Sequence, residues 1–119
     1  MLKRVMLPFI VATSLLAVGG CSLCNRPPVV VVSYTPTNPV QSDDIYLDAT
    51  QTADPEGDTL TFTWSLPTVP PFSSTVIDDP DNPATYFYAD QDGDYVLRLV
   101  VSDGTNSVQA DIDISVSAP

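Results

Sequence analysis

The chain has no histidine and very few basic residues. Its 119 residues contain four Lys and Arg against fifteen Asp and Glu, and two of the basic residues are Lys3 and Arg4. After residue 21 only Arg26 and Arg98 are basic, and with fifteen carboxylates this part has a formal charge of −13. Proteins that bind nucleic acids or anionic lipid headgroups neutralise phosphates with cationic side chains. The charge balance therefore argues against a nucleic-acid partner and against a polybasic membrane patch.

The chain also lacks the usual groups of a catalytic centre. A serine or threonine nucleophile needs an adjacent base, and without histidine or a lysine beyond residue 3 only carboxylates remain. Pairs of carboxylates serve in glycoside hydrolysis. Nearly all the acids here are expected in turns or on outward strand faces, and the chain is too short for a sandwich with a deep cleft. We predict that the protein is not an enzyme.

The N-terminal segment has the order of a signal peptide. Lys3 and Arg4 precede an apolar run of 14 residues from Val5 to Val18, which two glycines separate from Cys21. This run is shorter than the roughly 20 residues that a membrane-spanning helix needs. A positive charge, then a short apolar core, then small residues is the order typical of a secretory signal peptide. The sequence VGGC at residues 18–21 resembles the lipobox of bacterial lipoproteins.

This resemblance implies a lipid-anchored protein of the cell envelope. Residues 1–20 would be the lipoprotein signal peptide, and Cys21 would carry covalent diacylglycerol and an N-acyl chain. Ser22 in place of aspartate favours the outer membrane over the inner one in a Gram-negative host. An ordinary secretory signal with an incidental cysteine is the alternative, whereas Leu23 is too large to precede a lipidated Cys24. With Cys21 lipidated, Cys24 has no partner for an internal disulfide.

The remaining chain shows the patterns of β-strands. Residues 21–28 form a lipidated N-terminus and tether in which Pro27-Pro28 favours extended backbone. Residues 29–117 form the domain, where apolar and polar residues alternate as in strands with one buried face. We predict strands at 29–34, 44–50, 59–66, 84–89, 94–101 and 107–116, and a short edge strand near 74–77. About seven strands with turn signals between them indicate an antiparallel β-sandwich, which the pattern alone does not separate from a small barrel.

Two motifs make the resemblance more specific. The first motif is the turn Asp54-Pro55-x-Gly57-Asp58, which precedes a strand that contains Trp64. The second is a G-x-Y sequence followed by alternating aliphatic residues and a D-G turn, formed by Gly93, Tyr95, Leu97, Leu99, Val101, Asp103 and Gly104. Residues 28–117 thereby resemble a PKD (polycystic kidney disease) domain, which implies an all-β, Ig-like or cadherin-like sandwich. The resemblance implies a non-catalytic module for adhesion, recognition or spacing, or alternatively a carbohydrate-binding or accessory subunit of an envelope or secreted hydrolase.

The physical roles of two aromatic residues agree with this resemblance. Trp64 is expected to fill the space between two sheets. Tyr95, at the start of its strand, lies where the hydroxyl of a tyrosine corner would hold a crossing connection. The proline-rich segment from Pro67 to Pro83 departs from the compact turn of the family, so the strand order there is open.

Two acidic turns are candidate calcium sites. Asp54, Glu56 and Asp58 alternate around Gly57, and Asp90, Asp92 and Asp94 alternate around Gly93. Calcium binds several hard oxygen ligands, although both glycines stand at the fourth loop position and not at the sixth as in an EF-hand. Aspartates in turns also accept hydrogen bonds from their own backbone. Both interpretations remain open, and no other cofactor is expected.

Exposed aromatic side chains are the remaining binding candidates. In residues 84–89 the alternation places Tyr86 and Tyr88 on one face and Phe87 on the other. Phe72 lies in the proline-rich connection and is also expected to be exposed. These residues would contact a protein or glycan partner that the sequence does not identify.

Overall fold

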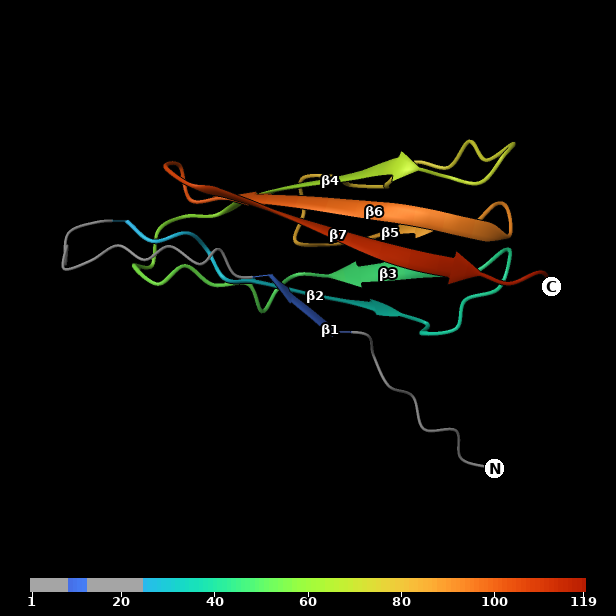
Figure 1. Cartoon of the computed structure of the whole chain (residues 1–119), viewed down its shortest axis with the longest axis horizontal. Helices are drawn as coiled ribbons and strands as arrows, with labels where there is room; N and C mark the ends of the chain where they lie inside the picture. The colour runs from blue at the N-terminus through green and yellow to red at the C-terminus, as the bar shows by residue number, and fades with distance from the viewer. Residues whose placement is uncertain (1–8, 13–24) are drawn as a thin grey trace, which may run out of the picture.

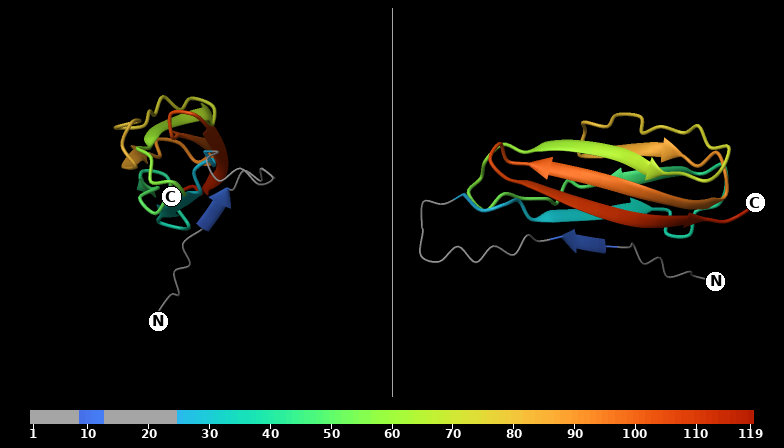
Figure 2. Two further views of the ribbon diagram at one scale, coloured as in Figure 1. Left: turned by 90° about the vertical axis from the view of Figure 1, so that its left-hand side faces the viewer. Right: turned by 45° about the horizontal axis from the view of Figure 1, so that its top comes forward.

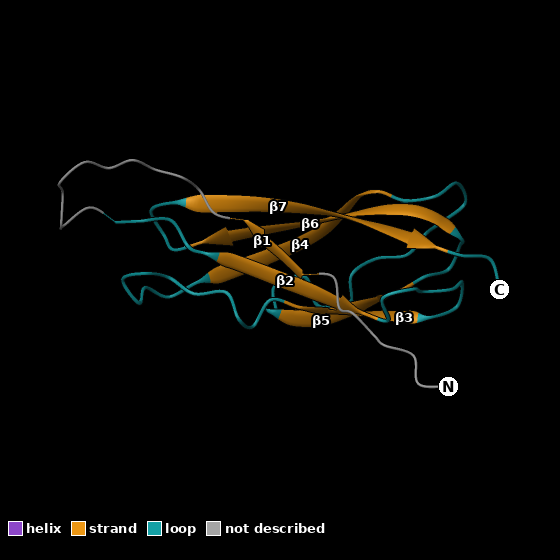
Figure 3. Cartoon of the chain, turned by 60° about the horizontal axis from the view of Figure 1, so that its bottom comes forward, coloured by secondary structure: helices purple, strands orange, loops and turns teal. Residues whose placement is uncertain are grey.

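The computed structural model describes residues 9–12 and 25–119, and this part of the chain consists of strands and loops without a helix (Figure 3). Two antiparallel sheets face each other, one with the order β1-β2-β3-β5 and one with the order β4-β6-β7 (Figure 1). The strands are β1 (Phe9–Ala12), β2 (Val30–Thr35), β3 (Asp44–Asp48), β4 (Thr61–Thr68), β5 (Ala84–Tyr88), β6 (Gly93–Ser102) and β7 (Ser107–Val116). The predicted Ig-like sandwich is confirmed.

The domain has six strands and not about seven. The expected edge strand at residues 74–77 is reduced to one isolated antiparallel bridge between Ile77 and Phe87. Prolines lack the N–H group that a strand ladder needs, and Pro70, Pro71 and Pro80 surround this segment. The other six strands begin and end within two residues of their predicted bounds.

The remaining strand, β1, lies in the apolar run that we predict to be part of the signal peptide. It pairs antiparallel with β2, with Phe9 opposite Ser33 and Ala12 opposite Val30. Cys21 and Cys24, the two cysteines of the lipoprotein hypothesis, lie outside the described residues. No helix in the described ranges is long and apolar enough to cross a membrane.

The core lies between the two sheets and follows the predicted alternation. Along β6 every second residue is buried (Tyr95, Leu97, Leu99 and Val101), and β7 buries every second residue from Val108 to Val116. Trp64 is 2% exposed. The rings of Phe87 and Tyr95 pack across the sandwich with centroids 5.4 Å apart. Burial of each large apolar side chain contributes about 1.5–3 kcal/mol, so these alternating residues hold the sheets together. Figure 2 shows the two sheets facing each other.

The edge strand β4 is irregular at its C-terminal end. Ser65 pairs with Arg98, but Thr68 pairs with Val96, so one extra residue forms a bulge on β4. Pro67 lies within this bulge, where its missing N–H does not interrupt the ladder. The indole Nε1–H of Trp64 donates to the carbonyl of Asn82 at 2.7 Å. This bond attaches the proline-rich connection to the core.

Tyr95 forms the expected tyrosine corner. Its hydroxyl donates to the backbone carbonyl of Gln91 at 2.7 Å and accepts from the Gln91 N–H at 3.1 Å. The ring is fully buried, and burial raises the pKa of this hydroxyl above its usual value. The corner fixes the connection between β5 and β6 at the end of the sandwich where the C-terminus lies (Figure 1).

Candidate functional site

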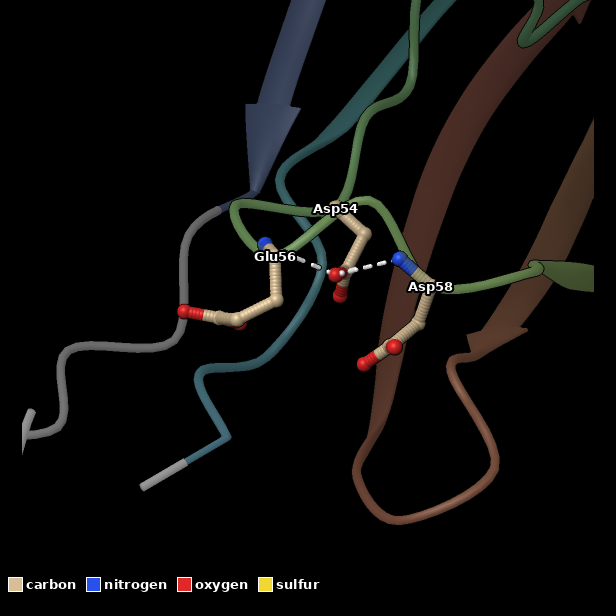
Figure 4. Close-up of side chains that lie close together, drawn as sticks. All are labelled: Asp54, Glu56 and Asp58. Atoms are coloured by element: carbon tan, nitrogen blue, oxygen red, sulfur yellow. Dashed lines mark hydrogen bonds between the residues drawn. The ribbon is translucent and has the colours of Figure 1, made fainter. Parts of the chain in front are cut away.

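The turn before β4 is built around the side chain of Asp54. Its Oδ2 accepts hydrogen bonds from the backbone N–H groups of Glu56 and Asp58, both at 2.9 Å (Figure 4). The Gly57 N–H donates to the Asp54 carbonyl at 3.0 Å, and Gly57 adopts φ +78°, which favours glycine. The sequence therefore forms this turn by the backbone bonding that is common for aspartate.

The same turn gathers negative charge. One carboxylate oxygen of each of Asp54, Glu56 and Asp58 lies within 4.8 Å of the others. Asp103, from the loop after β6, adds a fourth carboxylate whose charge acts on this turn. Burial, together with the charges of the other three carboxylates, raises the pKa of Asp58 above its usual value. Four acidic groups therefore repel one another at this end of the sandwich.

One atom of this cluster lacks a hydrogen bond. The Oδ1 atom of Asp54 is buried, and no group in the described part of the chain donates to it. By contrast, Asp103 is well satisfied, since backbone N–H groups of Asn106 and Thr105 donate to its Oδ1 at 2.6 and 2.8 Å. The bond from Asn106 is the foremost reason why the pKa of Asp103 lies below its usual value.

The cluster contacts the predicted tether itself, at Asn25 and Arg26. The Arg26 side chain donates through Nε to Oε2 of Glu56 at 2.7 Å, and its backbone N–H donates to Oε1 at 3.0 Å. The side-chain bond from Arg26 is the main cause that lowers the pKa of Glu56. Asn25 donates to Asp103 at 2.8 Å, and its carbonyl accepts from the Asn106 side chain at 3.2 Å.

We call this set of contacts the tether junction and define it by Asn25, Arg26, Asp54, Glu56, Asp58 and Asp103. Its oxygen atoms fit the preferences of a hard cation, because calcium binds carboxylate oxygens and tolerates irregular geometry. The unsatisfied Oδ1 of Asp54 supports that fit. Both oxygens of Glu56 already bind Arg26, so a cation that used this carboxylate would compete with the arginine.

The second acidic turn has a different geometry. Within the described residues, Asp90, Asp92 and Asp94 do not form a comparable group of close carboxylates. Asp94 accepts a hydrogen bond from the Ser115 hydroxyl at 2.8 Å, while Asp92 is exposed. This turn precedes β6, whereas Asp103 follows it, so the two acidic regions lie at opposite ends of the sandwich.

Asp90, unlike Asp92 and Asp94, is hydrogen-bonded to the loop after β4. Its carboxylate accepts from the Ser73 hydroxyl at 2.6 Å and from the Ser74 N–H at 2.8 Å. Burial tends to raise the pKa of Asp90, but these bonds and one from Tyr95 outweigh it and lower the pKa. The side chain thus ties the loop after β4 to the tyrosine corner.

The structure places the predicted aromatic residues as follows. Tyr86 and Tyr88 point away from the core and Phe87 points into it, in agreement with the alternation. Phe72 is 93% exposed. The sequence interpretation missed Tyr46, which lies opposite Tyr86 across β3 and β5 and is 53% exposed. The alternation in residues 44–50 placed Tyr46 on the outer face, but only the strand pairing shows its neighbour.

Tyr46 and Tyr86 border an open groove of about 410 Å³ on the outer face of the first sheet. Their ring centroids are 5.7 Å apart, and the ring planes are inclined by 40°. The groove crosses the middle strand β3 and its neighbours β2 and β5. It is lined by Ser33, Tyr34, Thr35, Tyr46, Leu47, Asp48, Ala84, Thr85 and Tyr86. Phe72 does not belong to this groove.

The domain region matches a known family. A family model described as "K319L-like, PKD domain" matches residues 36–116. Among solved structures, the chain is similar to a nucleoside hydrolase-related hypothetical protein from Saccharophagus degradans that is associated with carbohydrate metabolism. The identity is 20% and the TM-score is 0.60 over 80% of this chain. The chain spans 26% of that protein's length, so the similarity concerns the fold alone. No curated protein matches the sequence.

Proposed function

The chain belongs to the PKD domain family, a non-catalytic type of module, and from the lipobox-like residues 18–21 we propose that it is a lipid-anchored envelope protein. Its domain would serve adhesion, recognition or spacing next to the membrane. Cys21 would carry the lipid, and Ser22 would direct the protein to the outer membrane of a host with two membranes. Two or three acyl chains together anchor a protein firmly, whereas one chain binds only marginally.

The tether junction is the observation that carries this proposal. Asn25 and Arg26 are bonded to Asp103 and Glu56, so the chain is fastened to the domain before the predicted tether ends at residue 28. Only residues 22–24 separate the proposed lipidated Cys21 from Asn25. Four residue steps span at most about 15 Å. The junction would therefore lie close to the lipid surface, with the C-terminus at the far end of the sandwich (Figure 1).

We propose that calcium, when present, binds at the tether junction. Asp54, Asp58 and Asp103 would hold it, and its charge would offset the repulsion between their carboxylates. It would also make the connection between tether and domain more rigid, as suits a spacing or recognition module.

Lipidation is tested on the full chain expressed in a bacterial host with labelled palmitate. We expect the wild type to incorporate the label and to lose residues 1–20, which mass spectrometry of its N-terminal peptide would show. Cys21→Ser should abolish both changes. Cys24→Ser is the matched control and should behave as the wild type. A label that persists in Cys21→Ser, or an unlipidated mature protein that starts at another residue, would contradict the anchor.

A second candidate function is a carbohydrate-binding or accessory subunit of an envelope or secreted hydrolase. The outward position of Tyr86 and Tyr88 on β5 favours it. The groove beside Tyr86 allows this candidate to be stated more specifically.

A further inference from the structure

We propose that the groove on the outer face of the first sheet binds a neutral glycan chain. We call it the outer-sheet groove and define it by the outward residues Ser33, Thr35, Tyr46, Asp48, Ala84 and Tyr86. The proposal deepens the recognition role proposed above and rests on it, but it does not require the lipid anchor or calcium.

The strand register explains why a hollow forms here. Tyr46 is opposite Tyr86 on one side, while Asp48 is opposite Ala84. Ser33 is opposite Asp48 on the other side of β3. Large rings thus stand next to small side chains on the same face, and the small residues leave the hollow that the rings border. Its volume of about 410 Å³ falls within the range of small-ligand sites.

The two tyrosine rings supply an apolar contact with polar ends. Tyr46 is 53% exposed although it lies on the middle strand of the domain's first sheet. Exposed tyrosines provide rigid contact area and a hydroxyl at little cost in conformational entropy. A sugar ring presents C–H groups on its faces and hydroxyls around its edge, so it can stack on an aromatic ring and form hydrogen bonds beside it.

The groove is rich in hydrogen-bonding groups that are not used within the domain. In residues 25–119, no protein group bonds to the hydroxyls of Ser33, Thr35, Tyr46 or Tyr86. Asp48 uses Oδ1 to accept from the backbone and side chain of Thr50, and no group in the described part of the chain donates to its Oδ2. These groups include both donors and acceptors, as hydroxyl-bearing ligands require.

The negative charge around the groove distinguishes neutral from anionic ligands. None of the described residues that line the groove is cationic. The outer face of β3 also carries the exposed Asp44, opposite Tyr88. Anionic sugars would meet repulsion from Asp44 and Asp48 without an arginine or lysine to offset it. A neutral glycan has no such penalty.

A proline-rich peptide is the other ligand that tyrosine-lined grooves commonly bind. Its prolines offer carbonyl acceptors but no N–H donor. Such a peptide offers few donors for Oδ2 of Asp48, whereas every hydroxyl of a sugar can donate to it. The groove therefore favours the glycan.

The test uses the protein as its bacterial host produces it, purified in a detergent without a sugar headgroup. Isothermal titration calorimetry would measure binding of uncharged glucose and N-acetylglucosamine hexasaccharides, with hexagalacturonate and a proline-rich peptide as comparison ligands. We expect at least one neutral hexasaccharide to bind with a Kd of about 0.1–1 mM. Tyr46→Ala and Tyr86→Ala should each weaken it by about tenfold. Phe72→Ala removes a more exposed aromatic side chain outside the groove and should leave the affinity unchanged.

Thermal melts of the variants would confirm that they remain folded. Tyr46→Phe would keep the stacking ring that Tyr46→Ala removes. The proposal is overturned if no neutral hexasaccharide binds, if Tyr46→Ala binds as well as the wild type, or if only the anionic or the proline-rich ligand binds. None of these results bears on palmitate labelling at Cys21, so a failure of the groove proposal is distinguishable from a failure of the proposed anchor.

Discussion

Replacement of Asp54 by alanine and by asparagine separates two roles of the acidic turn. Oδ2 of Asp54 accepts from two backbone N–H groups, whereas its buried Oδ1 has no donor within the described residues. Alanine removes both oxygens. Asparagine keeps one acceptor for the backbone and replaces the charged carboxylate with a neutral group of the same shape.

The expected magnitudes follow from these contacts. A net contribution of about 0.5–1.5 kcal/mol for each lost hydrogen bond gives roughly 1–3 kcal/mol for Asp54→Ala. In a domain of this size that corresponds to a fall in Tm of about 5–15 °C. Without calcium, Asp54→Asn should be at least as stable as the wild type, because it keeps the turn and removes one of four mutually repelling charges.

The assay is thermal unfolding by circular dichroism in EGTA and in millimolar calcium. Calcium should raise the Tm of the wild type, since it binds the folded state and not the unfolded chain. Asp54→Asn should lose most of this response while it keeps its stability in EGTA. Asp92→Asn removes the same charge from an exposed position in the other acidic turn, and it should respond to calcium as the wild type does.

Two outcomes would refute this reasoning. If the wild-type melts in calcium and in EGTA superimpose, the junction carboxylates serve only the turn and the calcium proposal is wrong. If Asp54→Asn in EGTA is as unstable as Asp54→Ala, the backbone hydrogen bonds of Asp54 do not stabilise the turn as argued.

Three further predictions concern the stability of the sandwich. Tyr95→Phe should lower the unfolding free energy by about 1–3 kcal/mol in urea melts, because the hydrogen bonds with Gln91 are lost; an unchanged midpoint would mean that the corner does not need the hydroxyl. Gly93→Ala should be more destabilising than Gly104→Ala, since both have φ above +90° but only the Cβ at 93 would meet Pro70, at 3.0 Å. Equal Tm values for the two variants would contradict that steric argument. Acid should destabilise the protein. Four carboxyls have a lowered pKa in the folded state: Glu56, Asp90, Asp103 and Asp111. Such groups stabilise the fold above their unfolded pKa and lose that contribution as the pH falls through the folded value, whereas Asp58, with its raised pKa, acts in the opposite direction. The unfolding free energy should therefore decrease below about pH 4, and a steady increase down to pH 2 in urea titrations would be inconsistent with these shifts.

The fold was largely predictable because alternation reports directly on burial. The strand predicted at 107–116 has the bounds that the structure shows. The residues that alternate along 94–101 on one face, from Tyr95 to Val101, are buried together. The proline-rich segment was the exception. Its short apolar stretch at 74–77 resembles an edge strand, but whether such a stretch pairs depends on the path of the flanking prolines, and the sequence does not give that path.

The candidate sites were predictable only where they are local. The turn around Asp54 is formed by residues within four positions of one another, so its spacing already indicated a cluster. The contributions of Asp103 and Arg26 depend on contacts across 49 and 30 residues, respectively. Likewise, Tyr46 and Tyr86 meet because β3 pairs with β5 across the sheet. No periodicity in one sequence gives these pairings.

The proposed lipid anchor at Cys21 and the proposed glycan site in the outer-sheet groove together restrict where the protein would act. The junction would hold the base of the domain within about 15 Å of the lipid surface. The longest strands have ten residues, which extend about 33 Å, and the outer-sheet groove lies beside strands that run in the same direction. A ligand in the groove would therefore lie within about 50 Å of the membrane. If both proposals hold, a glycan bound in this groove would belong to the envelope or lie against it, as expected for the local envelope role that we propose and not for a far-reaching adhesin.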